Sequence, residues 1–136
     1  MKYELVTSDT KTIGGATLFR IRALVKLANA NPGDLGGYIE SEKNLSQTGD
    51  AWVSGDACVF GKARVYDDAV VSGNAWVYGY SYVSGDAQVS GDAHVSGDAH
   101  VSGKAWVCGK ARVSDDAHVC GDSHVSGIEE NKQGGH

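Results

Sequence analysis

The chain has 136 residues and a formal net charge of −5 at pH 7, with 12 Lys and Arg against 17 Asp and Glu. This length is typical of one domain. The acidic balance argues against a general binder of nucleic-acid polymers, which needs a surplus of cations. No run approaches eighteen consecutive apolar residues, so we expect no contact with a membrane through a spanning helix.

Residues 1–48 lack the repeat that follows and are expected to form a capping segment. KYELV (2–6) and LFRIRALVKL (18–27) alternate apolar and polar residues like edge strands, although the second run also fits a short helix. NPGDLGGY (31–38) is a cluster of turn residues. The N-terminus MKYELVTSDTK carries acids and lacks the apolar stretch of a secretory signal. Because stacked repeats need a cover over their open sheet edge, this segment is the expected β cap.

A six-residue repeat occupies residues 49–127. Valine falls at every sixth position from Val53 to Val125 without an insertion, and a small residue stands two positions before each Val. Two positions after Val the residue is Gly, except at Asp67 and Asp115. Side chains two apart on a strand share a side, so Val and the small residue point inward. Gly permits the positive φ of a sharp corner. Each repeat therefore predicts one short strand and one corner.

This repeat closely resembles that of the hexapeptide-repeat proteins, and the resemblance implies a left-handed parallel β-helix of triangular section. Three repeats then make one coil of 18 residues, with coils about 4.8 Å apart. The expected fold is all-β: a left-handed parallel β-helix of about four triangular coils over residues 49–127, an N-terminal β cap and a polar tail at 128–136.

The run GDLGGYIESEKNLSQTGDAWV (33–53), followed by GDAxV repeats, resembles a family of small phage and prophage proteins that are often labelled as transferases. The resemblance implies a phage setting and the host cytoplasm. Three cysteines at unpatterned spacing, Cys58, Cys108 and Cys120, also favour a reducing cytoplasm over a disulfide scaffold.

A step of 18 residues places the outward residues that precede Val in one column on each flat face. The columns are Trp52, Val70, Gln88, Trp106 and His124 on the first face; Cys58, Trp76, His94 and Arg112 on the second face; and Arg64, Tyr82, His100 and His118 on the third face. Because the inward residues hardly vary, function is expected in these columns and in the outward residues that follow Val.

Outward aromatic side chains are the most conspicuous variation. A cluster of exposed rings marks either an interface or a ligand site, and packing between copies of the chain is the favoured interpretation. Relatives with this repeat are typically trimers, so the resemblance implies a homotrimer. The residues predicted at the interface are Phe60, Tyr66, Trp52 and Trp106.

Four histidines occupy outward columns, and three interpretations stay open for them. The resemblance to hexapeptide acyltransferases implies that His100 or His118 would act as general base in a coenzyme-A-dependent reaction. Stacked imidazoles also suit a metal ion, but no carboxylate alternates with them, so no metal is expected. Duplication of the repeat GDAHVS explains them without any function. The repeat is never interrupted by the loop that such acyltransferases use, and no catalytic residue is therefore assigned.

The function expected from the sequence is that of a non-catalytic, oligomeric binding protein. Its ligand would be a small, anionic, nucleotide-like molecule held in grooves between protomers, because aromatic rings stack on bases and cations meet phosphates. The residues predicted to bind it are Trp76, Tyr78, Tyr80, Tyr82, Arg64, His94, His100 and Arg112. No cofactor is expected, except coenzyme A if the acyltransferase alternative holds. A purely structural scaffold without a small ligand is the further alternative.

Overall fold

A computed structural model describes residues 1–126 and 130–131 of the chain. A hairpin of β1 (Tyr3–Ile13) and β2 (Ala16–Ala23) is followed by β3 (Leu35–Ile39) and by the 3-10 turn η1 (Glu42–Asn44). Two-residue strands then follow at regular intervals: β4 (Trp52–Val53), β5 (Cys58–Val59), β6 (Arg64–Val65), β7 (Val70–Val71), β8 (Trp76–Val77), β9 (Tyr82–Val83), β10 (Gln88–Val89), β11 (His94–Val95), β12 (His100–Val101), β13 (Trp106–Val107), β14 (Arg112–Val113), β15 (His118–Val119), β16 (His124–Val125) and β17 (Glu130–Asn131).

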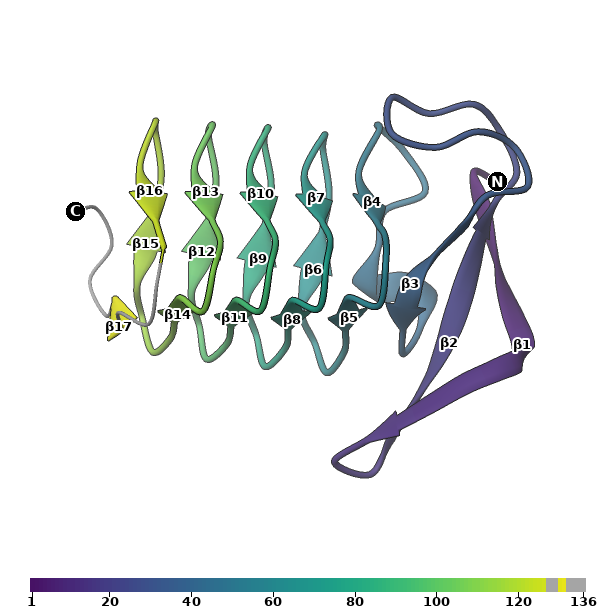
Figure 1. The fold of residues 1–136 in the computed structure, drawn as a ribbon, viewed down its shortest axis with the longest axis horizontal. Helices are drawn as coiled ribbons and strands as arrows, with labels where there is room; N and C mark the ends of the chain where they lie inside the picture. The colour runs from purple at the N-terminus through teal and green to yellow at the C-terminus, as the bar shows by residue number, and fades with distance from the viewer. Residues whose placement is uncertain (127–129, 132–136) are drawn as a thin grey trace.

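These strands stack into three sheets that form the faces of a solenoid (Figure 1). The first face has the order β4-β7-β10-β13-β16, and the third face has the order β6-β9-β12-β15. The second face continues into the cap in the order β1-β2-β3-β5-β8-β11-β14-β17. From β4 to β14, each strand pairs in parallel with the strand 18 residues later, as Trp52 does with Val70 and His100 with His118. The predicted columns of residues 18 positions apart are therefore confirmed.

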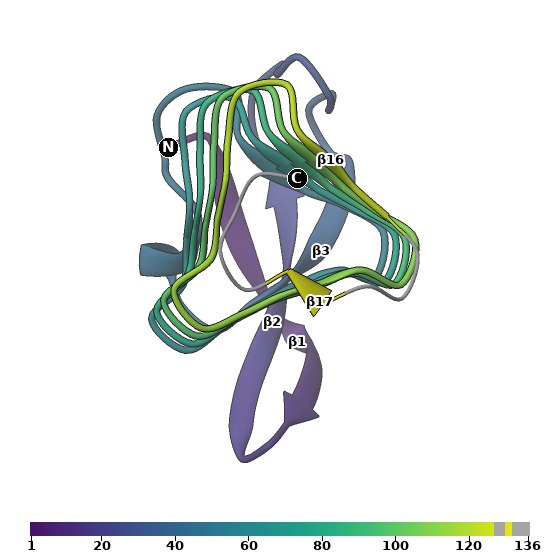
Figure 2. The same ribbon diagram turned by 90° about the vertical axis from the view of Figure 1, so that its left-hand side faces the viewer.

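The solenoid is left-handed and triangular in section. In Figure 2, where its C-terminal end faces the viewer, the chain turns clockwise as it advances toward the viewer. The predicted all-β, left-handed parallel β-helix with an N-terminal β cap is confirmed. The winding reaches about five turns instead of about four, because β3 pairs in parallel with β5 and Leu45 bridges Val65, which adds a turn before β4.

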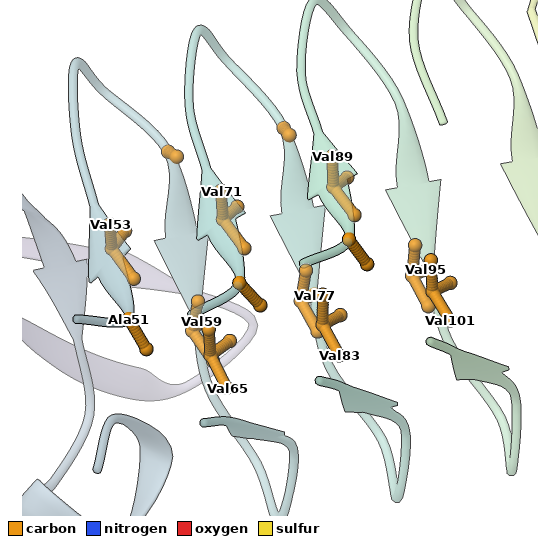
Figure 3. Packing of buried hydrophobic residues seen from close by; sticks show 14 of the residues in the cluster. Ala51, Val53, Val59, Val65, Val71, Val77, Val83, Val89, Val95 and Val101 are labelled. Carbon is orange, nitrogen blue, oxygen red and sulfur yellow. The ribbon is translucent and has the colours of Figure 1, made fainter. Parts of the chain in front are cut away.

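Inward valines and alanines fill the interior of the solenoid. The valines of successive coils point to the centre in register, from Val53 and Val59 onward (Figure 3). The side chains of Val53 to Val119 in this series are completely buried, as are the alanines two residues before them. Burying one valine side chain stabilises the fold by about 1.5–3 kcal/mol. At Ser81, which replaces one alanine, the buried hydroxyl donates to the carbonyl of Tyr78 at 2.7 Å.

The N-terminal hairpin closes one end of this interior. Tyr3 and Ile21 are completely buried in the same apolar cluster as the valines. The run 18–27, for which a helix was an alternative, contributes strand β2. Arg20 ties the hairpin to the first turn, since its guanidinium donates to Asp9 Oδ2 at 2.8 Å, to the carbonyl of Gly36 at 2.8 Å and to the Tyr38 hydroxyl at 2.6 Å. The tip of the hairpin projects past the second face (Figure 2).

The far end of the chain adds one more strand to the second face. Residues 130–131, which belong to the predicted polar tail, form β17 alongside β14. The other residues of that tail lie outside the described residues. Within residues 1–126 and 130–131, no helix has both the length and the hydrophobicity that crossing a lipid bilayer requires.

Candidate functional site

Aromatic rings of one column lie face to face across neighbouring coils. On the third face the rings of Tyr82 and His100 stack with centroids 5.1 Å apart, and those of His100 and His118 stack at 4.8 Å. The cause is the parallel register, which sets equivalent side chains one strand spacing apart, at about 4.8 Å. Ring faces inside this column are therefore occupied by other rings, and a planar ligand finds a free face only at an end of the stack.

One end of the stack opens on a groove of about 410 Å³. His100 covers one side of Tyr82, and the residues on the other side belong to the preceding coil and to η1. Tyr66 meets the ring of Tyr82 edge-on at 6.2 Å. The complete lining is Glu42, Lys43, Ser46, Arg64, Val65, Tyr66 and Tyr82. The groove therefore joins an aromatic wall to charged side chains.

Asn44 holds η1 against the solenoid. Its buried side-chain amide donates to the carbonyls of Gly61 at 3.2 Å and Ala63 at 2.9 Å. Its Oδ1 accepts the backbone N–H groups of Glu40 at 3.1 Å and Ser41 at 2.9 Å. These bonds satisfy the buried amide, as burial requires, and they fix the turn that carries Glu42 and Lys43 beside the third face.

Three cations surround this region. Lys43 and Arg64 line both the groove and an adjoining hollow of about 450 Å³, where Lys62 joins them. Glu40 also lines the hollow, and its carboxylate accepts the backbone N–H of Gly61 at 2.8 Å. In the described part of the chain, none of the three cations forms an ion pair. Their charges are thus available to an anion although the whole chain is acidic.

The second face carries a separate aromatic cluster. Phe60 stacks on Tyr78 at 5.1 Å, and Trp76 stacks on His94 at 5.1 Å. Phe60 and Trp76 also pack against the buried residues Leu18, Tyr38 and Cys58, so the hairpin covers the beginning of this cluster. Burial, and next the charge of Arg112, lower the pKa of His94.

The predicted ligand-binding residues therefore divide between two faces. Arg64 and Tyr82 meet in the groove of the third face, with His100 one coil further along. Tyr80 stands at the corner between the faces and is 59% exposed. The others, Trp76, Tyr78, His94 and Arg112, lie on the second face. Within one chain these two sets do not form one site.

Sequence reasoning missed Glu42 and Lys43, because both precede the repeat. A usable signal was present in Ser41-Glu-Lys-Asn44, where the Ser41 hydroxyl accepts the N–H of Lys43 at 3.3 Å and Asn44 completes the cap. Such Ser-x-x-Asn spacing is that of a capped turn. It would have predicted a short helical turn directly before the solenoid.

The predicted interface residues have different surroundings. Phe60 and Tyr66 are half-buried beside other rings. Trp106 is 46% exposed on the first face, stacks on His124 at 5.0 Å and donates to Ser90 Oγ at 3.2 Å. The prediction for Trp52 is wrong: its side chain is 1% exposed within the apolar core, where Tyr3 of the hairpin meets its ring edge-on with centroids 6.5 Å apart. It has no free surface for a second copy.

His100 and His118, on which an acyltransferase would depend, are the middle and the last member of the third-face stack. His100 lies between Tyr82 and His118, so the faces of its ring are covered. His118 is exposed. A catalytic role for either residue stays a prediction.

Two comparisons with known proteins bear on this architecture. A family model described as the YdcK beta solenoid repeat matches residues 63–79 and 87–103. No curated protein matches the chain. The matched segments run from the strand of Arg64 to that of Trp76 and from that of Gln88 to that of His100. Together with the stacked strands, this similarity shows a repeat protein of the β-solenoid kind.

Proposed function

We propose that this chain is a non-catalytic binding protein for a small anionic ligand with a planar ring, a nucleotide or a close chemical relative. The observation that carries the proposal is the groove that Arg64, Lys43 and the ring of Tyr82 line together. A planar ring in the groove would lie against Tyr82, beside Arg64, which precedes Tyr82 in the same column. The phosphate of the ligand would then lie among the cations.

The chemistry of the lining supports this division of roles. Stacking of a base on an aromatic side chain contributes roughly 1–3 kcal/mol and tolerates different bases. The planar guanidinium of Arg64 can donate two parallel hydrogen bonds to a phosphate, whereas Lys43 acts as a point charge. Neither cation has to leave an ion partner within the described residues, so binding need not break an existing pair.

The oligomeric state and the setting belong to the same proposal. We propose that copies of the chain associate, as a homotrimer, through the half-exposed rings of the second face, led by Trp76 and Tyr78. The groove would then adjoin the neighbouring protomer. In the phage setting that the sequence resemblance implies, the protein would sequester its ligand in the host cytoplasm, where the three free cysteines would stay reduced.

Isothermal titration of the purified chain with nucleoside monophosphates tests the proposal. We expect saturable binding that Arg64→Ala weakens roughly tenfold to a hundredfold, the equivalent of one lost charge-assisted hydrogen-bond pair. Arg112→Ala is the matched control, because Arg112 occupies the same position of the repeat and is also exposed, but on the second face.

Three outcomes would contradict the proposal. Absence of binding in the titration would favour the scaffold alternative, and an equal loss with Arg112→Ala would move the site to the second face. Release of free coenzyme A from an acyl-coenzyme A, lost in His100→Ala, would instead identify an acyltransferase.

A further inference from the structure

One carboxylate stands among the cations of the groove. Glu42 lines it together with Lys43 and Arg64, yet within the described residues it forms an ion pair with neither. Its carboxylate accepts one long hydrogen bond of 3.3 Å, donated by Gln47 Nε2 to Oε1. A groove that recognised charge alone would gain nothing from this acid, since it repels an anion. A ligand of this groove would therefore gain from offering hydrogen-bond donors as well as negative charge.

Glu42 is held in place through its backbone. The buried Tyr3 hydroxyl lies 3.3 Å from the carbonyl of Glu42 and donates to that of Leu45. Asn44, two residues along η1, is anchored to the solenoid by its amide. The carboxylate is thus presented from a fixed turn, which reduces the ordering cost of binding.

We propose that Glu42 makes the groove selective for guanine nucleotides, an inference that rests on the proposed function. A carboxylate accepts hydrogen bonds through two oxygens. Guanine presents two adjacent donors, N1–H and the 2-amino group, on the edge that a protein can read while the ring stacks on an aromatic side chain. Adenine has an unprotonated N1 on that edge and leaves one carboxylate oxygen without a partner. The ring would lie on Tyr82, the base edge would face Glu42 and the phosphate would meet Arg64.

Titrations of the full chain with GMP, IMP and AMP measure this selectivity. A matched bidentate contact discriminates by roughly tenfold or more, so GMP is expected to bind at least about tenfold more tightly than AMP. IMP, which keeps N1–H and lacks the 2-amino group, is expected between them. Glu42→Gln should bring GMP close to AMP. Glu40→Gln is the matched control, since the carboxylate of Glu40 is already engaged by Gly61 and its replacement should leave the order unchanged.

These titrations distinguish a failure of the guanine selectivity from a failure of the proposed binding function. If GMP and AMP bind equally and Arg64→Ala weakens both, the binding function stands and selectivity by Glu42 is overturned. The inference is also overturned if Glu42→Gln keeps the preference for GMP. If none of the three nucleotides binds, the proposed function fails and the selectivity fails with it.

Discussion

Gly85 shows at the scale of one residue why the repeat varies so little at its corners. Its φ is +64°, and a Cβ built there would lie 2.9 Å from the backbone nitrogen of Gly103 in the next coil. Asp67 shows how one corner tolerates a side chain: its φ is +59°, and its carboxylate accepts the N–H of Gly85 at 3.1 Å. Asp is among the residues that tolerate the left-handed region best. The corner therefore demands a left-handed conformation, and close approach between coils, as at Gly85, leaves little room for a Cβ.

Replacing two glycines separates these demands. Gly121 has the same φ of +64°, but among the described residues nothing lies within 4 Å of a built Cβ. Gly121→Ala should cost about 1–2 kcal/mol of unfolding free energy for the left-handed conformation alone. Gly85→Ala should cost about 1–3 kcal/mol more, because the new methyl group meets backbone that cannot move aside. Chemical denaturation measures both. Equal losses in the two variants would mean that close approach between coils does not limit the corner.

At the scale of elements, the hairpin and the first turn of the solenoid form one unit that the six-residue repeat does not predict. The strands from Val53 to Val125 could be predicted from the six-residue period, because each repeat packs against equivalent repeats in the neighbouring coils. The turn before them escapes that pattern, because its inward residues Ile39, Leu45 and Val53 are six and then eight positions apart. The side chain of Gln47, in the longer interval, accepts the backbone N–H of Lys2 at 2.8 Å. The insertion thus joins the turn to β1.

Replacing each of the three tryptophans tests which parts of the surface the hairpin buries and which it leaves exposed. Trp52→Ala should lower the unfolding free energy by about 3–5 kcal/mol, because the ring is covered by Tyr3 in the core. Trp106→Ala, in the same column, should change it by less than about 1 kcal/mol, as is usual at a surface. Trp76→Ala should dissociate the proposed oligomer. Denaturation and sedimentation velocity provide the readouts. Similar stability losses at Trp52 and Trp106 would contradict the role given to the hairpin.

At the scale of the whole molecule, the candidate site lies where the unrepeated segment meets the third face. The column of Arg64 and Tyr82 could be predicted, because a step of 18 residues places them one above the other. Glu42 and Lys43 could not, since no period relates them to the solenoid. The burial of Trp52 was equally hidden, because its cover comes from Tyr3, far away along the chain. Regular stacking thus explains the walls of the molecule, while the contacts of its cap decide which wall carries a groove.

The most direct test of the binding groove is a crystal structure of the chain soaked with GMP. We expect electron density for the base against Tyr82 inside the groove, with the phosphate within hydrogen-bonding distance of Arg64. Density for the nucleotide beside Trp76 and Arg112 on the second face, with the third-face groove empty, would contradict it.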